Sequence, residues 1–217
     1  MEKQITAIEA QKRNRNRVNI SLDGEFAFSL DRLTAVWLKP GRKLSESDIE
    51  QLLAQDELEN AFARALHFLG YRARSTWELQ DFLEGKGVSV TVIISVMDRL
   101  KQEGYLDDTR FSQDWVENRS TFRPRSQSLL KTELRHKGIA EPTIQTALDK
   151  ANLDDIDLAF LAGRKIAGRY TNLTWEEFRT KLRNHLLRRG FTYQVVNQVT
   201  RQVWSELQNS GHMDATL

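Results

Sequence analysis

The sequence predicts a mainly α-helical protein, a tandem array of three three-helix repeats forming a curved, elongated body, preceded by a small N-terminal β-hairpin or three-stranded unit. Three observations predict this fold: apolar alternation confined to the start of the chain, apolar spacings of three or four afterwards, and a repeat of about fifty residues occurring three times. The expected parts are the β-unit at 1–43, a connecting helix at 44–57, repeats at 58–108, 109–155 and 156–209, and a disordered tail at 210–217.

Two short runs of alternating apolar residues predict the β-hairpin. The first covers residues 18–22 and the second covers residues 26–30. Asp23 and Gly24 lie between them, and this dipeptide suits a type I′ turn because both central residues need positive φ. A third strand around Ile5 is expected, since an isolated two-stranded hairpin is barely stable in water.

The repeat is visible when the chain is shifted against itself. A shift of 51 places Arg74, Ser75, Leu79, Leu83, Lys86 and Gly87 on Arg125, Ser126, Leu130, Leu134, Lys137 and Gly138. A further shift of 52 carries Leu130, Leu134, Lys137 and Gly138 onto Leu182, Leu186, Arg189 and Gly190. Apolar residues at helical spacing divide each copy into three helices. Neighbouring copies must stack to bury these apolar faces.

Helix-end signals recur in the middle helix of each copy. Ser75 with Glu78 forms a capping box at the start, and a glycine after a cation predicts a left-handed C-terminal cap. Thr174 and Glu177 form another capping box, one turn earlier than the register requires. The middle helix of the third copy is therefore expected to be longer.

Composition and motifs argue against catalysis. The chain has no cysteine, and its four histidines stand apart from one another in the sequence. The acid pairs Asp107–Asp108 and Asp154–Asp155 lie between predicted helices, where aspartate usually accepts hydrogen bonds from the start of the next helix rather than binding a metal. We expect no enzyme activity, no metal and no cofactor. Without a long apolar run, no membrane partner is expected either, and the expected location is the cytoplasm.

Clusters of basic residues are the best candidates for a partner-binding surface. Net charge is only +2, but residues 156–209 carry nine basic and four acidic residues, whereas residues 58–108 carry six and eight. A solvated helix surface explains any single cluster, yet arginines recur near helix starts, where guanidinium groups suit phosphate or carboxylate partners. The candidates are Arg72, Arg74, Arg119, Arg123, Arg125, Lys131, Arg135, Arg164, Lys165, Arg169, Arg179, Arg183, Arg188 and Arg189.

Four groups of residues form recognisable motifs. They are Arg72, Arg74, Ser75, Glu78, Leu79, Leu83, Lys86 and Gly87; Gly104 to Asp108 with Arg110, Phe111, Trp115, Val116 and Arg119; Glu133, Leu134, Lys137, Gly138 and Ile139; and Arg188 to Phe191. These motifs resemble the RecX family, and the match covers about residues 58–208. The N-terminal hairpin resembles an extension found in longer members. Two positions depart from the family pattern: Ser112 stands where alanine is common, and residues 124–126 replace a glycine-containing turn.

The resemblance implies a non-catalytic, monomeric regulator in DNA repair. Such a protein binds in the groove of the RecA filament. It modulates the ATPase, recombinase and coprotease activities of the filament by inhibiting them. It also binds single- and double-stranded DNA weakly and without sequence specificity. The alternative is a helical DNA-binding protein that acts without RecA. Because the basic residues are spread over many helices rather than along one recognition helix, the pattern favours the regulator.

Overall fold

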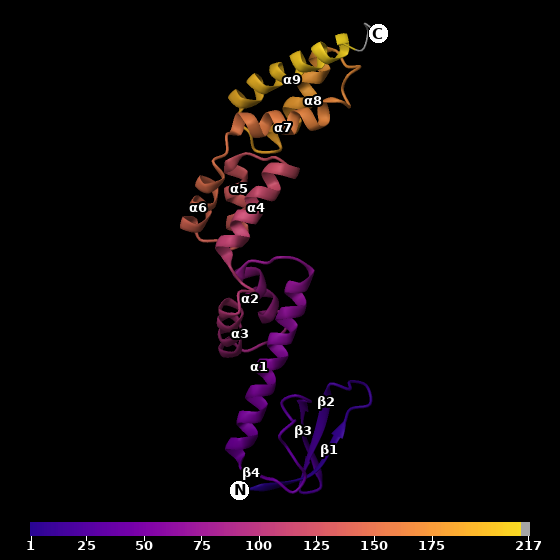
Figure 1. The fold of residues 1–217 in the computed structure, drawn as a ribbon, viewed down its shortest axis with the longest axis vertical. Helices are drawn as coiled ribbons and strands as arrows, with labels where there is room; N and C mark the ends of the chain where they lie inside the picture. The colour runs from indigo at the N-terminus through magenta and orange to yellow at the C-terminus, as the bar shows by residue number, and fades with distance from the viewer. Residues whose placement is uncertain (214–217) are drawn as a thin grey trace. The chain divides into compact units, whose positions relative to one another are not determined.

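The computed structural model describes residues 1–213, and within them the chain is mainly helical, as predicted (Figure 1). Contacts divide the chain into two units: Met1–Arg74 with Leu79–Leu106, and Ser75–Glu78 with the chain from Asp107 onward. The helices are α1 (Glu46–Tyr71), α2 (Thr76–Glu84), α3 (Val90–Gln102), α4 (Asp108–Phe122), α5 (Gln127–His136), α6 (Glu141–Ala151), α7 (Asp155–Ala167), α8 (Trp175–Leu187) and α9 (Tyr193–Met213).

The N-terminal strands form an antiparallel sheet in the order β3-β2-β1-β4, where the sequence predicted two or three strands. The φ angles of 51° at Asp23 and 92° at Gly24 confirm the predicted turn. The fourth strand was missed, because two residues carry no detectable alternation. The strands are β1 (Lys3–Ala10), β2 (Arg17–Leu22), β3 (Glu25–Asp31) and β4 (Lys43–Leu44).

Helix α1 is longer than the sequence pattern indicated. Ser45 caps it through a capping box with Asp48, and the helix then continues for 26 residues. The predicted boundary between residues 57 and 58 therefore lies inside a continuous helix. The chain from 46 to 69 contains neither glycine nor proline, so nothing interrupts the helical hydrogen bonds there.

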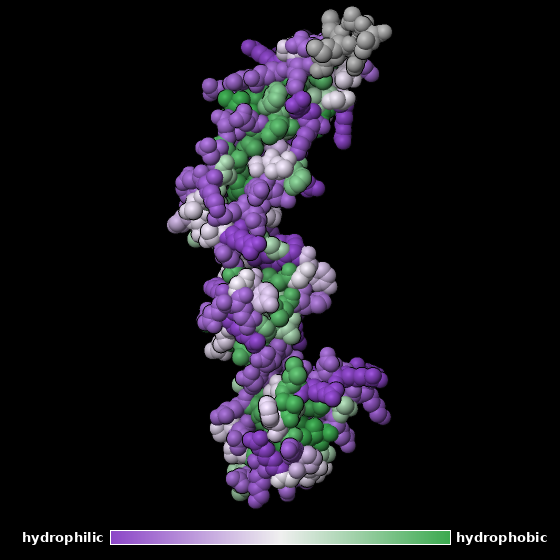
Figure 2. Space-filling model, viewed as in Figure 1, coloured by the Kyte–Doolittle hydropathy of each residue, from purple (hydrophilic) through white to green (hydrophobic). Residues whose placement is uncertain are grey.

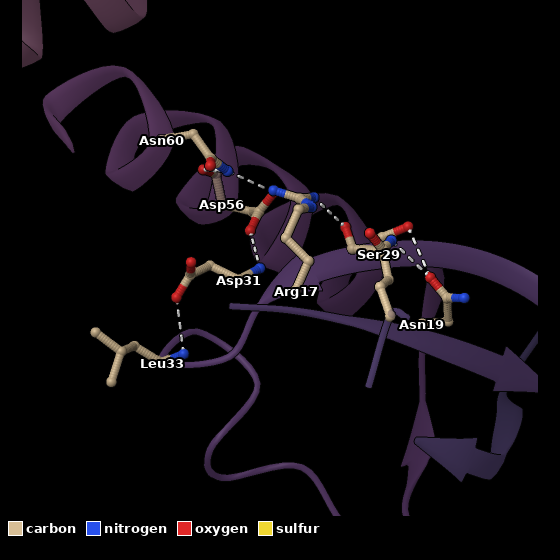
Figure 3. A network of polar contacts seen from close by, with 8 residues as sticks. Arg17, Asn19, Ser29, Asp31, Leu33, Asp56 and Asn60 are labelled. Atoms are coloured by element: carbon tan, nitrogen blue, oxygen red, sulfur yellow. Dashed lines mark hydrogen bonds and ion pairs between the residues drawn. The ribbon is translucent and has the colours of Figure 1, made fainter. Parts of the chain in front are cut away.

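A buried carboxylate fixes the sheet to α1. Asp56, only 6% exposed, accepts hydrogen bonds from the Arg17 guanidinium (2.9 Å), the backbone N–H of Asp31 and the Asn60 amide (2.9 Å) (Figure 3). Arg17 also donates to the backbone oxygen of Ser29 (2.8 Å). A buried charge is tolerated when it is paired and hydrogen-bonded in this way. Sequence patterns did not indicate this network, because its members come from separate elements.

Each three-helix module has its own apolar core. Helices α1, α2 and α3 surround a cluster that includes the fully buried Leu79 and Leu83. In the second unit, α4, α5 and α6 enclose Leu130 and Leu134, while α7, α8 and α9 enclose a third cluster around Leu182. These leucines are register equivalents, so the predicted core positions of the middle helices are confirmed.

The predicted helix ends are also confirmed. Ser75 and Glu78 exchange capping hydrogen bonds of 3.2 Å, and Thr174 and Glu177 form a capping box at the start of α8. The glycines that follow α2, α5 and α8 have φ of 73°, 72° and 85°. Helix α8 has 13 residues, against 9 in α2 and 10 in α5, as its earlier cap predicts.

The end of the chain differs from the expectation. Helix α9 runs to Met213, past the boundary at residue 210 where a disordered tail was expected, and residues 214–217 lie outside the described part. Charged and polar residues cover much of the face seen in Figure 2, with hydrophobic residues between them. Within residues 1–213, no helix is long and apolar enough to span a membrane.

Candidate functional site

Two serines at equivalent repeat positions each donate a hydrogen bond to a backbone oxygen at the end of the next middle helix, one through its hydroxyl and the other through its backbone N–H. In the first joint (residues 75–78, 108 and 137–138), Ser75 Oγ donates to the backbone oxygen of Lys137 at 2.6 Å. In the second joint (residues 123–129, 155, 185 and 188–190), the Ser126 backbone N–H donates to the backbone oxygen of Arg189 at 3.0 Å. The repeat register relates Ser75 to Ser126 and Lys137 to Arg189, so the two joints are equivalent.

The acid pairs have structural roles in these joints. Asp107 and Asp154 cap the helices that follow them, α4 and α7, as predicted. The second member of each pair does something that the sequence did not indicate. Asp108 accepts from the first backbone N–H of α2 (2.8 Å), and Asp155 accepts from the first backbone N–H of α5 (2.9 Å). In the described residues, no three acidic or histidine side chains gather in a way that could hold a metal ion.

The second joint contains a pocket with four arginines in its lining. Two of them lie in the segment between α4 and α5, and the other two directly follow α8. The pocket has a volume of about 530 Å³ and no acidic residue in its lining. We call it the arginine pocket; it is lined by Arg123, Arg125, Leu129, His185, Arg188 and Arg189.

One carboxylate next to the pocket neutralises part of its charge. Glu133 of α5 pairs with the guanidinium groups of Arg125 and Arg119, the latter at 3.0 Å, and accepts a hydrogen bond from Trp115 Nε1 at 2.8 Å. Its side chain is 13% exposed, so these interactions are shielded from solvent. Arg119 and Arg125 are therefore held in place by a folded-state ion pair.

The hydrogen-bond partners of Arg189 in the pocket are neutral groups. Arg189 donates to His185 Nε2 (2.8 Å) and to the backbone oxygen of Pro124 (2.9 Å). Burial, with the positive charges of Arg189 and Arg188, lowers the pKa of His185 to about 4, so its ring is neutral at neutral pH. Among the described side chains, no carboxylate forms an ion pair with Arg123, Arg188 or Arg189.

Crowding of like charges is evident at two of these guanidinium groups. Burial lowers the pKa of Arg125, and the neighbouring guanidinium groups of Arg119, Arg189 and Arg123 lower it further. Burial and the charge of Arg123 likewise lower the pKa of Arg189. The pocket is thus a place where an anion would relieve electrostatic repulsion.

The first joint is neutralised at the equivalent position. There, Lys137 Nζ forms an ion pair with Glu78 Oε1 at 2.5 Å, and both side chains are mostly buried. The register places Arg189 at the position of Lys137, but Leu129 at the position of Glu78. The second joint therefore keeps the cation and loses its acidic partner.

The structure brings four of the fourteen predicted basic residues together in the arginine pocket, and most of the others lie elsewhere in the second unit. Arg169 and Arg179 are exposed, and the half-buried Arg183 has a buried Nε without a hydrogen-bond partner. The remaining contacts are Arg135 with Glu141 (2.8 Å), Arg164 with Glu206 (3.2 Å), Lys131 with Gln145 (2.9 Å), and Lys165 with the backbone oxygens of Thr121 (2.6 Å) and Phe122 (3.2 Å).

Two predicted residues belong to the first unit. The Arg74 guanidinium lies 4.1 Å from the centre of the Phe68 ring, which is cation–π geometry. Arg72 is exposed and donates to the backbone oxygen of Ala73 at 2.9 Å.

Sequence analysis missed the uncharged part of the site. Leu129 and His185 line the pocket, but neither belongs to a basic cluster. The repeat itself held the signal, because the register aligns Glu78 with Leu129 and Glu133 with His185. Two positions that are acidic in one copy are therefore uncharged in the next.

Known protein families match four successive regions of the chain. Four family models match in order: the regulatory protein RecX N-terminal domain at residues 3–45, and the first, second and third RecX three-helix domains at residues 61–100, 107–148 and 154–200. A regulatory protein RecX from Bacillus licheniformis is 34% identical over 214 residues, covering 97% of this chain and 81% of the relative. The relative from Bacillus subtilis is 36% identical, covering 92% and 76%.

Solved structures agree with this assignment. A crystal structure of regulatory protein RecX has a TM-score of 0.65 and 25% identity, and the match covers 92% of this chain and 99% of that chain. RecX from Lactobacillus salivarius shares the fold, with a TM-score of 0.56 at 20% identity over 69% of this chain and 97% of that chain. With four consecutive domain matches and relatives above 30% identity along nearly its full length, this chain belongs to the RecX family of regulatory proteins.

Proposed function

We propose that this chain binds the RecA recombinase filament and restrains its ATPase, recombinase and coprotease activities. The protein acts as a monomer in the cytoplasm and contributes no catalytic group. It contacts DNA weakly and without reading its sequence. The observation that carries the proposal is the ordered match of all four RecX regions along residues 3–200. The resemblance of the chain to this family implies the RecA partner.

The arginine pocket supports this function because its chemistry suits a phosphate backbone. Its guanidinium groups come from the ends of α4 and α8 and from the segment before α5, and not from one exposed helix face. Base reading requires side chains aligned along an element that enters a groove. Contacts to phosphate position a protein on DNA without sequence preference. The pocket therefore favours binding that is independent of base order and sensitive to salt.

The direct test is the rate of ATP hydrolysis by RecA on single-stranded DNA. Addition of the purified chain should lower the rate in a concentration-dependent manner, because a bound regulator restrains the filament. An equal amount of heat-denatured chain is the control. An unchanged rate at saturating chain would refute the proposal.

The arginine pocket also favours a second candidate, a helical DNA-binding protein that acts without RecA. Titration of the chain against bare and RecA-coated single strands at two salt concentrations separates the two functions. Tighter binding to the coated strand is expected of the regulator, since the filament adds its own contacts along the chain. Equal affinity for both strands would favour the second candidate.

A further inference from the structure

We propose that the arginine pocket holds a phosphodiester group of a nucleic-acid strand together with part of its sugar. This inference rests on the proposed function and names the group that one site would engage. Neither the family match nor the other basic residues identify this location. Three features of the pocket support it: its charge, its difference from the first joint, and its size.

The first step is the charge. Five guanidinium groups, those of Arg125, Arg119 and the three arginines without acidic partners, lie in and beside the pocket, and Glu133 is the carboxylate that forms ion pairs with two of them. Arg189 is held by hydrogen bonds to neutral acceptors, so its position is fixed before a ligand arrives. Preorganised guanidinium groups bind phosphate oxygens strongly, often through two parallel hydrogen bonds.

The second step is the comparison within the chain. In the first joint, the Glu78 carboxylate forms an ion pair with Lys137 and so occupies the position of an anion. In the second joint, Leu129 occupies the equivalent position, and the Arg189 guanidinium has no acidic partner among the described side chains. In the first joint the chain itself supplies the anion that pairs with the cation. In the second joint a bound ligand would supply it.

The third step separates a phosphodiester from the carboxylates of an acidic protein. A volume of about 530 Å³ exceeds what a single carboxylate group fills, and it lies in the range typical of small-molecule sites. Leu129 and the neutral His185 ring add uncharged lining beside the cations. A nucleotide unit presents the matching pair of surfaces, a charged phosphate joined to an uncharged sugar. An acidic side chain carries its carboxylate on only one or two methylene groups, which offer no uncharged surface of the size of a sugar.

The test uses a pair of variants at one position. Leu129→Glu supplies the carboxylate that stands at the equivalent position of the first joint, while Leu129→Gln supplies similar bulk without charge. The acidic variant should bind a labelled single strand about tenfold more weakly than Leu129→Gln. Loss of the acidic variant through unfolding is not expected, because Glu78 is accommodated at the equivalent position. Far-UV circular dichroism and the melting temperature check this.

A second variant removes cations and leaves the carboxylates unchanged. Arg123→Gln with Arg188→Gln should reduce the slope of log affinity against log salt by about 1.4, since each lost contact to a single strand accounts for about 0.7. The matched control is Arg135→Gln with Arg164→Gln, which removes two exposed arginines that pair with glutamates elsewhere. That control should leave the slope unchanged.

Two probes identify the ligand chemistry. A methylphosphonate strand, which lacks backbone charge, should bind far more weakly than the phosphodiester strand, and an oligoglutamate of equal charge should compete poorly. Equal binding of the two strands, equal competition by oligoglutamate, or unchanged affinity of Leu129→Glu would overturn the inference. RecA ATPase, measured with the same variants, separates the two proposals. Inhibition by a chain whose DNA binding does not depend on the pocket refutes this inference alone, and pocket-dependent DNA binding without inhibition refutes the proposed function alone.

Discussion

The two joints of the second unit bring equivalent residues together and differ in their charge. In the first joint the C-terminal end of α5 docks on the start of α2, and in the second the C-terminal end of α8 docks on the start of α5. Asp108 and Asp155 accept hydrogen bonds from the first backbone N–H of α2 and of α5, respectively. The first joint is closed by the Lys137–Glu78 ion pair, whereas the second leaves Arg189 beside Leu129 and a neutral His185. The repeat thus preserves the aspartate contact and the pairing of the serine position with the end of the next middle helix, although the donor atom of the serine differs, and it varies the side chains around them. A binding site can therefore arise at one copy without altering the fold.

The largest expected loss of stability comes from the apolar cores of the second and third modules. It sets the scale for the smaller effects expected at the two joints. Leu134→Ala and its register equivalent Leu186→Ala should each cost about 2 to 5 kcal/mol, because both side chains are fully buried and leave a cavity. Urea denaturation followed by circular dichroism measures the loss. The two modules should lose similar amounts. A cost below about 1 kcal/mol for either would mean that the repeat register does not identify core positions.

The next prediction compares Gly138, which lies at the first joint, with Gly87, which has open space beside it. A Cβ added to Gly138 would lie 2.3 Å from Trp77 Cβ, whereas one added to Gly87 meets nothing within 4 Å, although both have positive φ. Gly138→Ala should therefore cost about 2 to 4 kcal/mol, from backbone strain together with overpacking. Gly87→Ala should cost about 1 kcal/mol from strain alone. Equal losses in parallel urea melts would indicate that the first joint does not require close approach.

A smaller effect tests the difference in charge between the joints. Lys137→Gln should cost about 1.5 to 3 kcal/mol, because it removes a charged hydrogen-bond donor from the mostly buried Glu78 carboxylate. Arg189→Gln should cost less than about 1 kcal/mol, since the lost hydrogen bonds are offset by relief of repulsion from the neighbouring arginines. Urea midpoints of the two variants provide the comparison. A larger loss for Arg189→Gln would mean that the second joint is not electrostatically strained.

Most of the fold was predictable from local patterns. The hairpin turn, the capping boxes, the core leucines and the longer α8 each depend on residues close together in sequence, and each repeat unit supplied an independent copy of the signal. Two of the errors have a common cause, because strand β4 depends on pairing with β1 and the Asp56 network depends on distant segments. The length of α1 was readable from the sequence, since no glycine or proline interrupts residues 46–69.

The candidate site was predictable only in part. Clustering identified Arg123, Arg125, Arg188 and Arg189 among fourteen candidates, but gave no reason to prefer them. That choice depends on which arginines have acidic partners, and such partners are set by three-dimensional contacts such as that of Glu133. The register alignment of Glu78 with Leu129 was available in the sequence. Its meaning required the observed contact between Glu78 and Lys137.

The smallest expected effect depends on pH and concerns His185, the register equivalent of Glu133. Burial and the adjacent charges of Arg189 and Arg188 lower its folded-state pKa to about 4 from an ordinary value of 6.5. Between these pH values the unfolded chain binds more protons than the folded chain. The stability contributed by the neutral ring is therefore fully present above pH 6.5 and is lost as pH falls towards 4. We expect a loss of about 1 to 2 kcal/mol for this half-buried group, once solvent screening is allowed for. Urea melts across this range should show the loss in the wild type but not in His185→Gln, whose amide oxygen accepts from Arg189 without titrating.

A phosphodiester strand in the arginine pocket should raise the His185 pKa, because it offsets the surrounding positive charge, and NMR titration of the ring measures this shift directly. A ring that titrates near 6.5 without DNA, or whose pKa does not move when DNA binds, would mean that the two joints do not differ electrostatically as their side chains indicate.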